Sequence, residues 1–166
     1  MEIFHEEKKS HSYRFRAVLQ QVGGKSFALT GRSLEGNIPK FIKARPGEAL
    51  VVRKWIKELP PRTLMCLLPN QVIVALNPVD GQIIKAWHSA EINQTPSLPD
   101  RSAKPSEVTG TPIDQFKPSP LASDSPRFLR YQIKGESALI SFKTQDGEKT
   151  VAISPEGTQS FSISIQ

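Results

Sequence analysis

Residues 64–88 constrain the fold more than any other stretch, because they form the longest apolar passage and are punctuated like a β-hairpin. The first arm, residues 72–76, is apolar at every position, which is typical of a strand buried on both faces. Residues 78–81 read Pro-Val-Asp-Gly, and they supply the fixed φ of proline and an Asp-Gly pair that tolerates positive φ. Residues 82–88 form the returning arm. We predict a hairpin in which Trp87 is buried.

Residues 12–30 are predicted to form a second hairpin. Their first part alternates between apolar and polar residues with the period of two that is typical of a strand. A Gly-Gly pair follows, and paired glycines admit the positive φ values of a tight turn. Residues 25–30 then form the returning strand. Residues 31–47 contain several glycines and prolines and are predicted to be mostly loop, with one short strand over residues 40–44.

Residues 48–59 fit two alternatives. As a helix, they bring their apolar residues onto one stripe at i, i+3, i+4 and i+7 spacing, and Pro60 and Pro61 act as the stop signal. As a strand, the β-branched pair Val51 and Val52 suits the pleated backbone. Neither alternating face of such a strand is cleanly apolar. We therefore favour the helix.

Residues 94–128 differ abruptly in composition, since they hold seven of the 14 prolines in the chain. Apolar residues are too sparse there to offset the entropy that is lost when a chain becomes ordered. We predict a disordered linker rich in proline and serine. Residues 111–116 are its one apolar cluster, so Ile113 and Phe116 are candidates for docking a protein partner through a segment that orders on binding.

Residues 129–166 return to alternating apolar and polar positions. Turn sequences at residues 146–147 and 155–157 divide them into a predicted three-stranded unit. A unit this small rarely folds alone, because its core is thin. We predict that it packs on a β-rich module formed by residues 12–93. The predicted fold class is therefore mostly β, a small barrel or sandwich built from hairpins, with one short helix, a long linker and a flexible N-terminus over residues 1–11.

Residue types that carry catalysis or bind metals are scarce. Cys66 is the only cysteine and lies among leucines, which favours a small buried apolar residue over a reactive thiolate. The three histidines lack the spacing of a metal site. The Gly-Gly-Lys-Ser sequence that ends at Ser26 matches only the end of a phosphate-binding loop, since the first glycine and the following helix are missing. We predict no enzymatic activity, no catalytic residues, no metal and no cofactor.

Nothing in the sequence indicates a membrane span or a targeting segment. No stretch approaches the roughly 18 consecutive apolar residues of a transmembrane helix. The first residues lack the apolar core of a signal peptide and carry acids that a transit peptide avoids. We expect an intracellular, cytoplasmic protein.

Positive charge is concentrated in the first third of the chain. Residues 1–62 contain 13 Lys and Arg against 6 Asp and Glu, whereas residues 63–166 contain 9 against 10. This asymmetry indicates an anionic partner for the first third, the alternative being a basic face that serves solubility. The candidate binding residues are Arg14, Arg16, Lys25, Arg32, Lys40, Lys43, Arg45, Arg53, Lys54 and Lys57.

The first two of these cations alternate with aromatic residues. Tyr13, Arg14, Phe15 and Arg16 follow one another, and this order suits a surface on which cations contact phosphates and rings stack on bases. A period of two, however, puts the rings and the guanidinium groups on opposite faces. We expect the rings to be in the core, so that phosphate contact without stacking is predicted there.

Two functions fit these observations. The first is non-enzymatic nucleic-acid binding, to DNA or RNA with a single strand slightly favoured, through the basic module. The second is a structural or adaptor role, in which the β-body and the linker dock protein partners or an acidic protein surface. Charge segregation favours the first. Salt dependence distinguishes the two, because phosphate contacts lose affinity steeply with salt and apolar interfaces do not.

Overall fold

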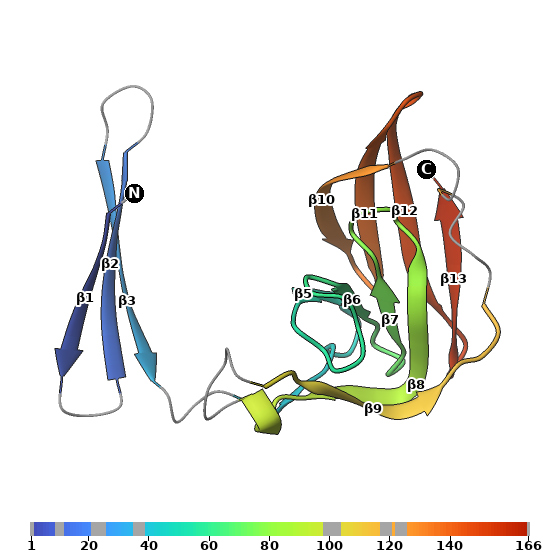
Figure 1. The fold of residues 1–166 in the computed structure, drawn as a ribbon, viewed down its shortest axis with the longest axis horizontal. Helices are drawn as coiled ribbons and strands as arrows, with labels where there is room; N and C mark the ends of the chain where they lie inside the picture. Colours follow the sequence, from blue (N-terminus) through green and yellow to red (C-terminus); the bar gives the residue numbers. More distant parts are fainter. Residues whose placement is uncertain are drawn as a thin grey trace. The chain divides into compact units, whose positions relative to one another are not determined.

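The protein has a mostly β structure in the computed structural model, as predicted (Figure 1). The structure describes residues 2–8, 12–20, 26–34, 39–97, 104–116, 121 and 126–165. The chain forms two compact units, Met1–Pro39 and Lys40–Gln166. Nothing helical in the described ranges has the length and apolar character that a membrane crossing requires.

The first unit contains a three-stranded antiparallel sheet in the order β1-β2-β3. Its strands are β1 (Glu2–Lys8), β2 (Ser12–Gln20) and β3 (Ser26–Leu34). The pairing of β2 with β3 agrees with the hairpin predicted over residues 12–30, whose Gly-Gly turn lies outside the described residues. β3 continues through residues 31–34, which the sequence predicts to be loop, because they stay paired with β2. Residues 2–8, predicted to be flexible, form β1.

The second unit begins with a six-stranded antiparallel sheet. Its strands are β4 (Phe41–Ile42), β5 (Leu50–Arg53), β6 (Leu64–Leu67), β7 (Ile73–Leu76), β8 (Ile83–Asn93) and β9 (Glu107–Pro112). Five follow the order β4-β8-β7-β6-β5, and β9 pairs with β8. The hairpin predicted over residues 64–88 is confirmed, since β7 pairs antiparallel with β8 and is buried at every position. Trp87 on β8 is only 6% exposed, also as predicted.

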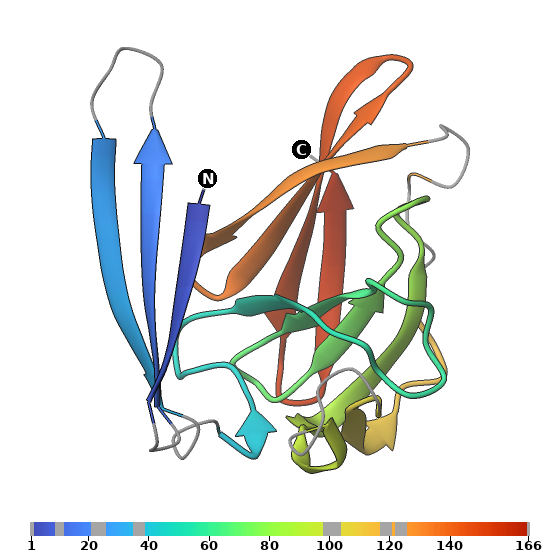
Figure 2. The same ribbon diagram turned by 60° about the vertical axis from the view of Figure 1, so that its left-hand side comes forward.

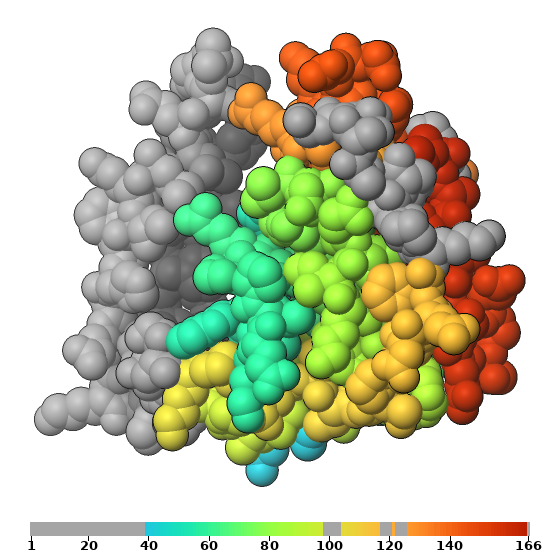
Figure 3. Space-filling view, turned by 45° about the vertical axis from the view of Figure 1, so that its right-hand side comes forward, coloured from blue at the N-terminus to red at the C-terminus, as the bar shows by residue number. Residues whose placement is uncertain are grey.

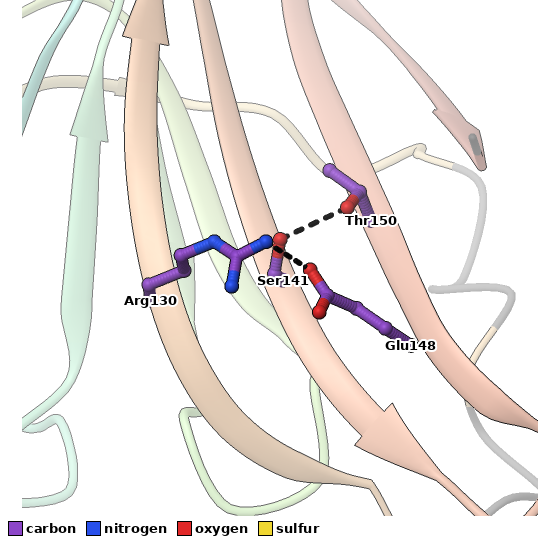
Figure 4. Close-up of polar contacts among 4 residues, drawn as sticks. All are labelled: Arg130, Ser141, Glu148 and Thr150. Atoms are coloured by element: carbon purple, nitrogen blue, oxygen red, sulfur yellow. Dashed lines mark hydrogen bonds and ion pairs between the residues drawn. The ribbon is translucent and has the colours of Figure 1, made fainter.

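The C-terminal part of the second unit is a four-stranded antiparallel meander rather than the predicted three strands. Its strands are β10 (Arg127–Lys134), β11 (Ser137–Thr144), β12 (Gly147–Glu156) and β13 (Ser160–Ile165). The overlooked turn is between β10 and β11, where Gly135 has a φ of 57°, a value that glycine adopts without strain. On this sheet Arg130 reaches across β11 to Glu148 on β12, and Ser141 bonds Thr150 at 2.9 Å (Figure 4).

Two hydrophobic clusters use the two faces of the six-stranded sheet. The inter-sheet core contains residues of both sheets and includes Leu64, Cys66, Val74, Leu76, Ala138, Ile140, Phe142, Val151 and Ile153. The outer core consists of Ile56, Leu59, Met65, Leu67, Ile73, Ala75, Trp87, Ala90 and Ile92. Successive residues of β6 and β7 alternate between the two clusters, as the period of two requires. These strands are therefore apolar throughout because both faces are covered, and the curled sheets form a half-barrel (Figure 2).

The helix favoured for residues 48–59 is wrong, and the strand alternative holds. Val51 pairs with Cys66 of β6, which is completely buried. Ala49 of the supposed helical stripe belongs to the inter-sheet core, whereas Ile56 and Leu59 of the same stripe belong to the outer core. The residues of this stripe are therefore not on one side of the chain, as a helix would require. Pairing with the buried strand β6 favours an extended conformation, and this outweighs the helical spacing of the apolar residues, because helix propensity is a weak local preference.

The predicted linker is ordered in part. Within residues 94–128, residues 95–97 form a short 3₁₀ helix, η2 (Thr95–Ser97), and residues 107–112 form β9. β9 pairs with β8 and places Val108 against the outer core. A prediction from local apolar density misses such a strand, because a strand that extends an existing sheet gains its stability from the partner's hydrogen bonds.

A corner in β8 produces the curl of this sheet (Figure 1). The register of β8 against β9 shifts between His88 and Glu91, and Ser89 has a φ of 51°. Such a bulge bends a strand and sharpens its twist. Gly110 of β9 faces the bulge with a φ of 125°. A Cβ atom there would lie 2.7 Å from the Ala90 Cβ and 2.8 Å from the His88 carbonyl oxygen, so the corner requires glycine.

We expect Gly110→Ala to lower the free energy of unfolding by about 2–4 kcal/mol, because the strained backbone and the close approach both oppose a methyl group. Gly147→Ala is a matched control, since Gly147 has a φ of 120° but no atom within 4 Å of an added Cβ. The control should cost less, by roughly the 1–3 kcal/mol that overpacking adds. Urea denaturation of both variants measures this difference. Equal costs would contradict the close contact at the corner.

Candidate nucleic-acid interface

The ten candidate cations fall into two groups. Arg14, Arg16 and Arg32 lie on β2 and β3 of the first unit, where the register sets Arg14 opposite Arg32, and Lys25 lies outside the described residues. The other six belong to the second unit and are Lys40, Lys43, Arg45, Arg53, Lys54 and Lys57. Residues 40–62 hold seven Lys and Arg against two Glu. The second unit alone therefore contains a strongly basic segment.

Three of these six cations contact other side chains. The guanidinium of Arg53 lies 5.1 Å from the centroid of the Phe128 ring, a cation–π contact that joins β5 to β10. Lys54 Nζ donates a hydrogen bond to Gln94 Oε1. Lys57 Nζ lies 3.4 Å from Glu107 Oε1. Arg53 is thus directed toward the second sheet, whereas Lys54 and Lys57 are held near the end of β8.

The remaining three cations, Lys40, Lys43 and Arg45, are exposed to solvent. No ion pair formed within the described ranges includes any of them. Their charges are therefore available to an external anion.

Two short segments of the second unit repeat one pattern. Residues 40–43 read Lys-Phe-Ile-Lys, and residues 54–57 read Lys-Trp-Ile-Lys. In both, the isoleucine packs in or against the outer core. In both, the ring stands out, since Phe41 and Trp55 are each 45% exposed. We call the six residues Lys40, Phe41, Lys43, Lys54, Trp55 and Lys57 the basic-aromatic surface.

The end of β8 brings these two segments together. β4 pairs with this end, and β9 pairs with it on the other side (Figure 2). Residues 55–57 run beside β9, because Ser106 donates to the Trp55 carbonyl at 3.0 Å and accepts from Lys57 N at 2.9 Å. In the order of pairing, β8 and β9 therefore lie between β4 and residues 55–57. Figure 3 shows the segment that contains residues 55–60 on the surface of the molecule.

The hydrogen bonds around Gln94 hold this arrangement in place. Gln94 is buried; its backbone N–H donates to the Lys40 carbonyl at 2.7 Å, and its side chain accepts from Lys54. Ser97 Oγ donates to the Gln94 carbonyl at 2.9 Å and bonds Ser106 Oγ at 3.0 Å. One network therefore connects the first lysine of each tetrad with the turn between β8 and β9.

Phe41, Trp55 and Lys57 are directed away from the outer core. Phe41 is opposite Asn93, which is in turn opposite Glu107, and directly opposed residues share a face of the sheet. Lys57 reaches that face through its ion pair with Glu107. Trp55 and Lys57 flank Ile56, which is only 1% exposed, so both are directed away from it. The exposed rings are thus accompanied by cations, with Glu107 as an acidic neighbour.

The two aromatic residues of this surface were not among the candidates predicted from the sequence. Trp55 is assigned there to the apolar stripe of the supposed helix, and Phe41 to a short strand in a loop. The repeated tetrad is the sequence signal that could have identified both. An aromatic residue between two lysines, followed by an isoleucine, fits an exposed ring beside a buried anchor.

The two candidates for partner docking pack against the protein's own core. Ile113 and Phe116 are half-buried beside the inter-sheet core. Ile113 N donates to the Ala86 carbonyl at 2.9 Å, and the Phe116 ring centroid lies 6.2 Å from that of Phe161. These contacts continue β9 along the body, so the apolar cluster of the predicted linker docks within the chain itself.

Reactive groups are sparse in the described part of the chain. Burial raises the pKa of the Cys66 thiol to about 12, so this thiol stays protonated at neutral pH and packs as an apolar residue. Among the described residues, no group of three or more His, Cys, Asp or Glu is placed to hold a metal ion.

Comparison of the chain with protein-family models, curated proteins and solved structures finds no match. Its function is therefore inferred from its own residues.

Proposed function

We propose that the protein binds single-stranded nucleic acid without catalysing a reaction, and that the basic-aromatic surface makes the contact. The observation that carries this proposal is the repeated tetrad, in which each exposed ring stands between two lysines and is anchored by a packed isoleucine. Exposed rings offer stacking faces to bases, and lysines contact phosphates. The bases of a duplex are stacked on one another, so rings of this kind favour a single strand.

The charges of this surface support phosphate contact more than protein contact. Lys40 and Lys43 carry charges that no described acid pairs with, and Arg45 follows closely in the chain. An adaptor that docks an apolar protein surface would use Phe41 and Trp55 alone. The adaptor function therefore remains as an alternative outcome of the test. Binding that does not change when the lysines are replaced would support it.

The salt dependence of binding tests the proposal. The affinity for a fluorescent single-stranded oligonucleotide should fall with salt, with a logarithmic slope of about 0.7 per phosphate contact. Lys40→Gln combined with Lys43→Gln should reduce that slope by about 1.4, because two phosphate contacts are lost. Fluorescence anisotropy at several salt concentrations measures both slopes.

A matched control uses two exposed lysines of the four-stranded sheet. Lys134→Gln combined with Lys143→Gln removes the same net charge from residues outside the basic-aromatic surface, and should leave the slope unchanged. Glu107→Gln removes the acid that pairs with Lys57 and should raise the affinity. No binding at low salt, or equal slopes for the two double variants, would contradict the proposal.

A further inference from the structure

A small pocket has Lys43 of the basic-aromatic surface among its lining residues, together with Leu67, Ile73 and Ala90 of the outer core. It has a volume of about 160 Å³ and lies among residues 43–46, the turn between β6 and β7, and β8. Ala44, Pro69, Ile73 and Ala90 contribute apolar walls. Lys43 and Gln71 are the lining residues with polar side chains. The pocket therefore combines apolar side chains with one cation and one amide, and its exposed lining is polar and apolar in similar measure.

The backbone around this pocket is held in unusual conformations. Gln71 has a φ of 61° and Ser89 a φ of 51°, values that residues other than glycine seldom adopt. The Gln71 carbonyl accepts a hydrogen bond from Ala90 N at 2.9 Å, and Leu68 N donates to the Val72 carbonyl at 2.8 Å. Residues with a strained backbone conformation persist only where several surrounding contacts hold them in place. The position of Gln71 beside β8 is thus fixed before any ligand arrives.

The size and chemistry of the pocket limit its ligand. A cavity of about 150 Å³ in another protein accepts benzene, so this pocket suits a single six-membered ring. A ring with apolar faces suits the apolar side chains of the walls, and a polar edge suits a hydrogen bond with the Gln71 amide. An anionic group on the ligand suits Lys43. A pyrimidine nucleotide within a strand has all three properties.

We propose that the pocket takes one unstacked pyrimidine base of the bound strand, with Lys43 at its phosphate and Gln71 at the polar edge of the base. This inference rests on the proposed function and adds base preference to it. Phosphate contacts carry no sequence information, so a preference must come from a base. Stacking on Phe41 and Trp55 accepts any base, because every base has a π-face.

The test compares single-stranded oligo-dT and oligo-dA of equal length. The wild type should prefer oligo-dT by about tenfold, in line with the contribution of one base contact. Since oligo-dA also stacks on itself, the preference alone is not sufficient, and a variant that fills the pocket is decisive. Ala44→Leu should reduce the preference to less than about twofold while leaving the salt slope unchanged. Ala44→Ser, which keeps the side chain small, should retain the preference.

Gln71→Gly is a second variant, and it should not destabilise the fold, because glycine adopts a φ near 61° readily. It should also weaken the preference, since the amide is lost. Salt-dependent binding without a preference, or with a preference that survives Ala44→Leu and Gln71→Gly, would overturn the base pocket and leave the proposed function standing. Absence of binding to either oligonucleotide at low salt would overturn both.

Discussion

Replacing Phe142 with alanine is expected to lower the free energy of unfolding by about 3–5 kcal/mol, the usual cost of emptying a buried aromatic site. Phe142 on β11 is completely buried in the inter-sheet core. Its ring centroid lies 6.2 Å from that of Phe128 in an edge-to-face arrangement. The far edge of the ring also lies close to Gly81 in the turn after β7, since a Cβ atom added at Gly81 would be 3.4 Å from it. Both sheets therefore lose contacts when this ring is removed.

Because the inter-sheet core contains residues of both sheets, the second unit should unfold in one cooperative transition and the variant should shift it as a whole. Phe41→Ala is the control: Phe41 is 45% exposed, so its loss should cost less than about 1 kcal/mol. Circular dichroism and tryptophan fluorescence during urea denaturation measure both. Two separate transitions, or a cost for Phe142→Ala no larger than the control's, would refute a shared core.

Combining Phe41→Ala with Trp55→Ala is expected to weaken single-strand binding by about 2–6 kcal/mol, because stacking contributes about 1–3 kcal/mol per base. A loss of 2 kcal/mol corresponds to about a 30-fold rise in Kd. The salt slope should stay near that of the wild type, since no cation is removed. Anisotropy titrations of the double and single variants measure the loss and show whether the two rings contribute additively.

The control for this variant is Tyr131→Ala. Tyr131 on β10 is 46% exposed, close to the exposure of Phe41 and Trp55, but lies outside the basic-aromatic surface. Its replacement should change the affinity by less than about twofold. If the double variant binds as tightly as the control, the rings do not stack on bases, and the lysines act as a purely electrostatic surface.

Local sequence patterns predicted the elements whose partners are close in the chain. The arms of residues 64–88 are joined by a short turn with Asp80 and Gly81, so composition and spacing were sufficient to identify the hairpin. The turn at Gly135 was missed although the apolar positions change there from odd numbers, Tyr131 and Ile133, to even numbers from Ala138 onward. Short-range patterns thus identify strands more reliably than the turns that divide them.

Long-range pairing explains the other errors. β5 is a strand because Val51 pairs with Cys66, and β9 is a strand because β8 offers it an edge. In each pair, ten or more residues separate the two strands in the sequence. The candidate site shows the same limit: the cations were visible as a charge count, but the sheet at the end of β8 decides which of them gather beside Phe41 and Trp55. A count of apolar residues in the sequence also assigns these two rings to the core. Only the exposed fractions of their side chains in the structure show that they face solvent.

Tryptophan fluorescence tests the central claim, that a single strand stacks on the basic-aromatic surface, most directly. The chain contains two tryptophans, of which Trp55 is 45% exposed and Trp87 is 6% exposed. Titration with a single-stranded oligonucleotide at low salt should quench the red-shifted emission of Trp55 and leave the blue-shifted emission of Trp87 unchanged. In Trp55→Phe, which keeps a ring for stacking, binding should persist by anisotropy while the quenching disappears. Binding that leaves the Trp55 emission unchanged would contradict the account.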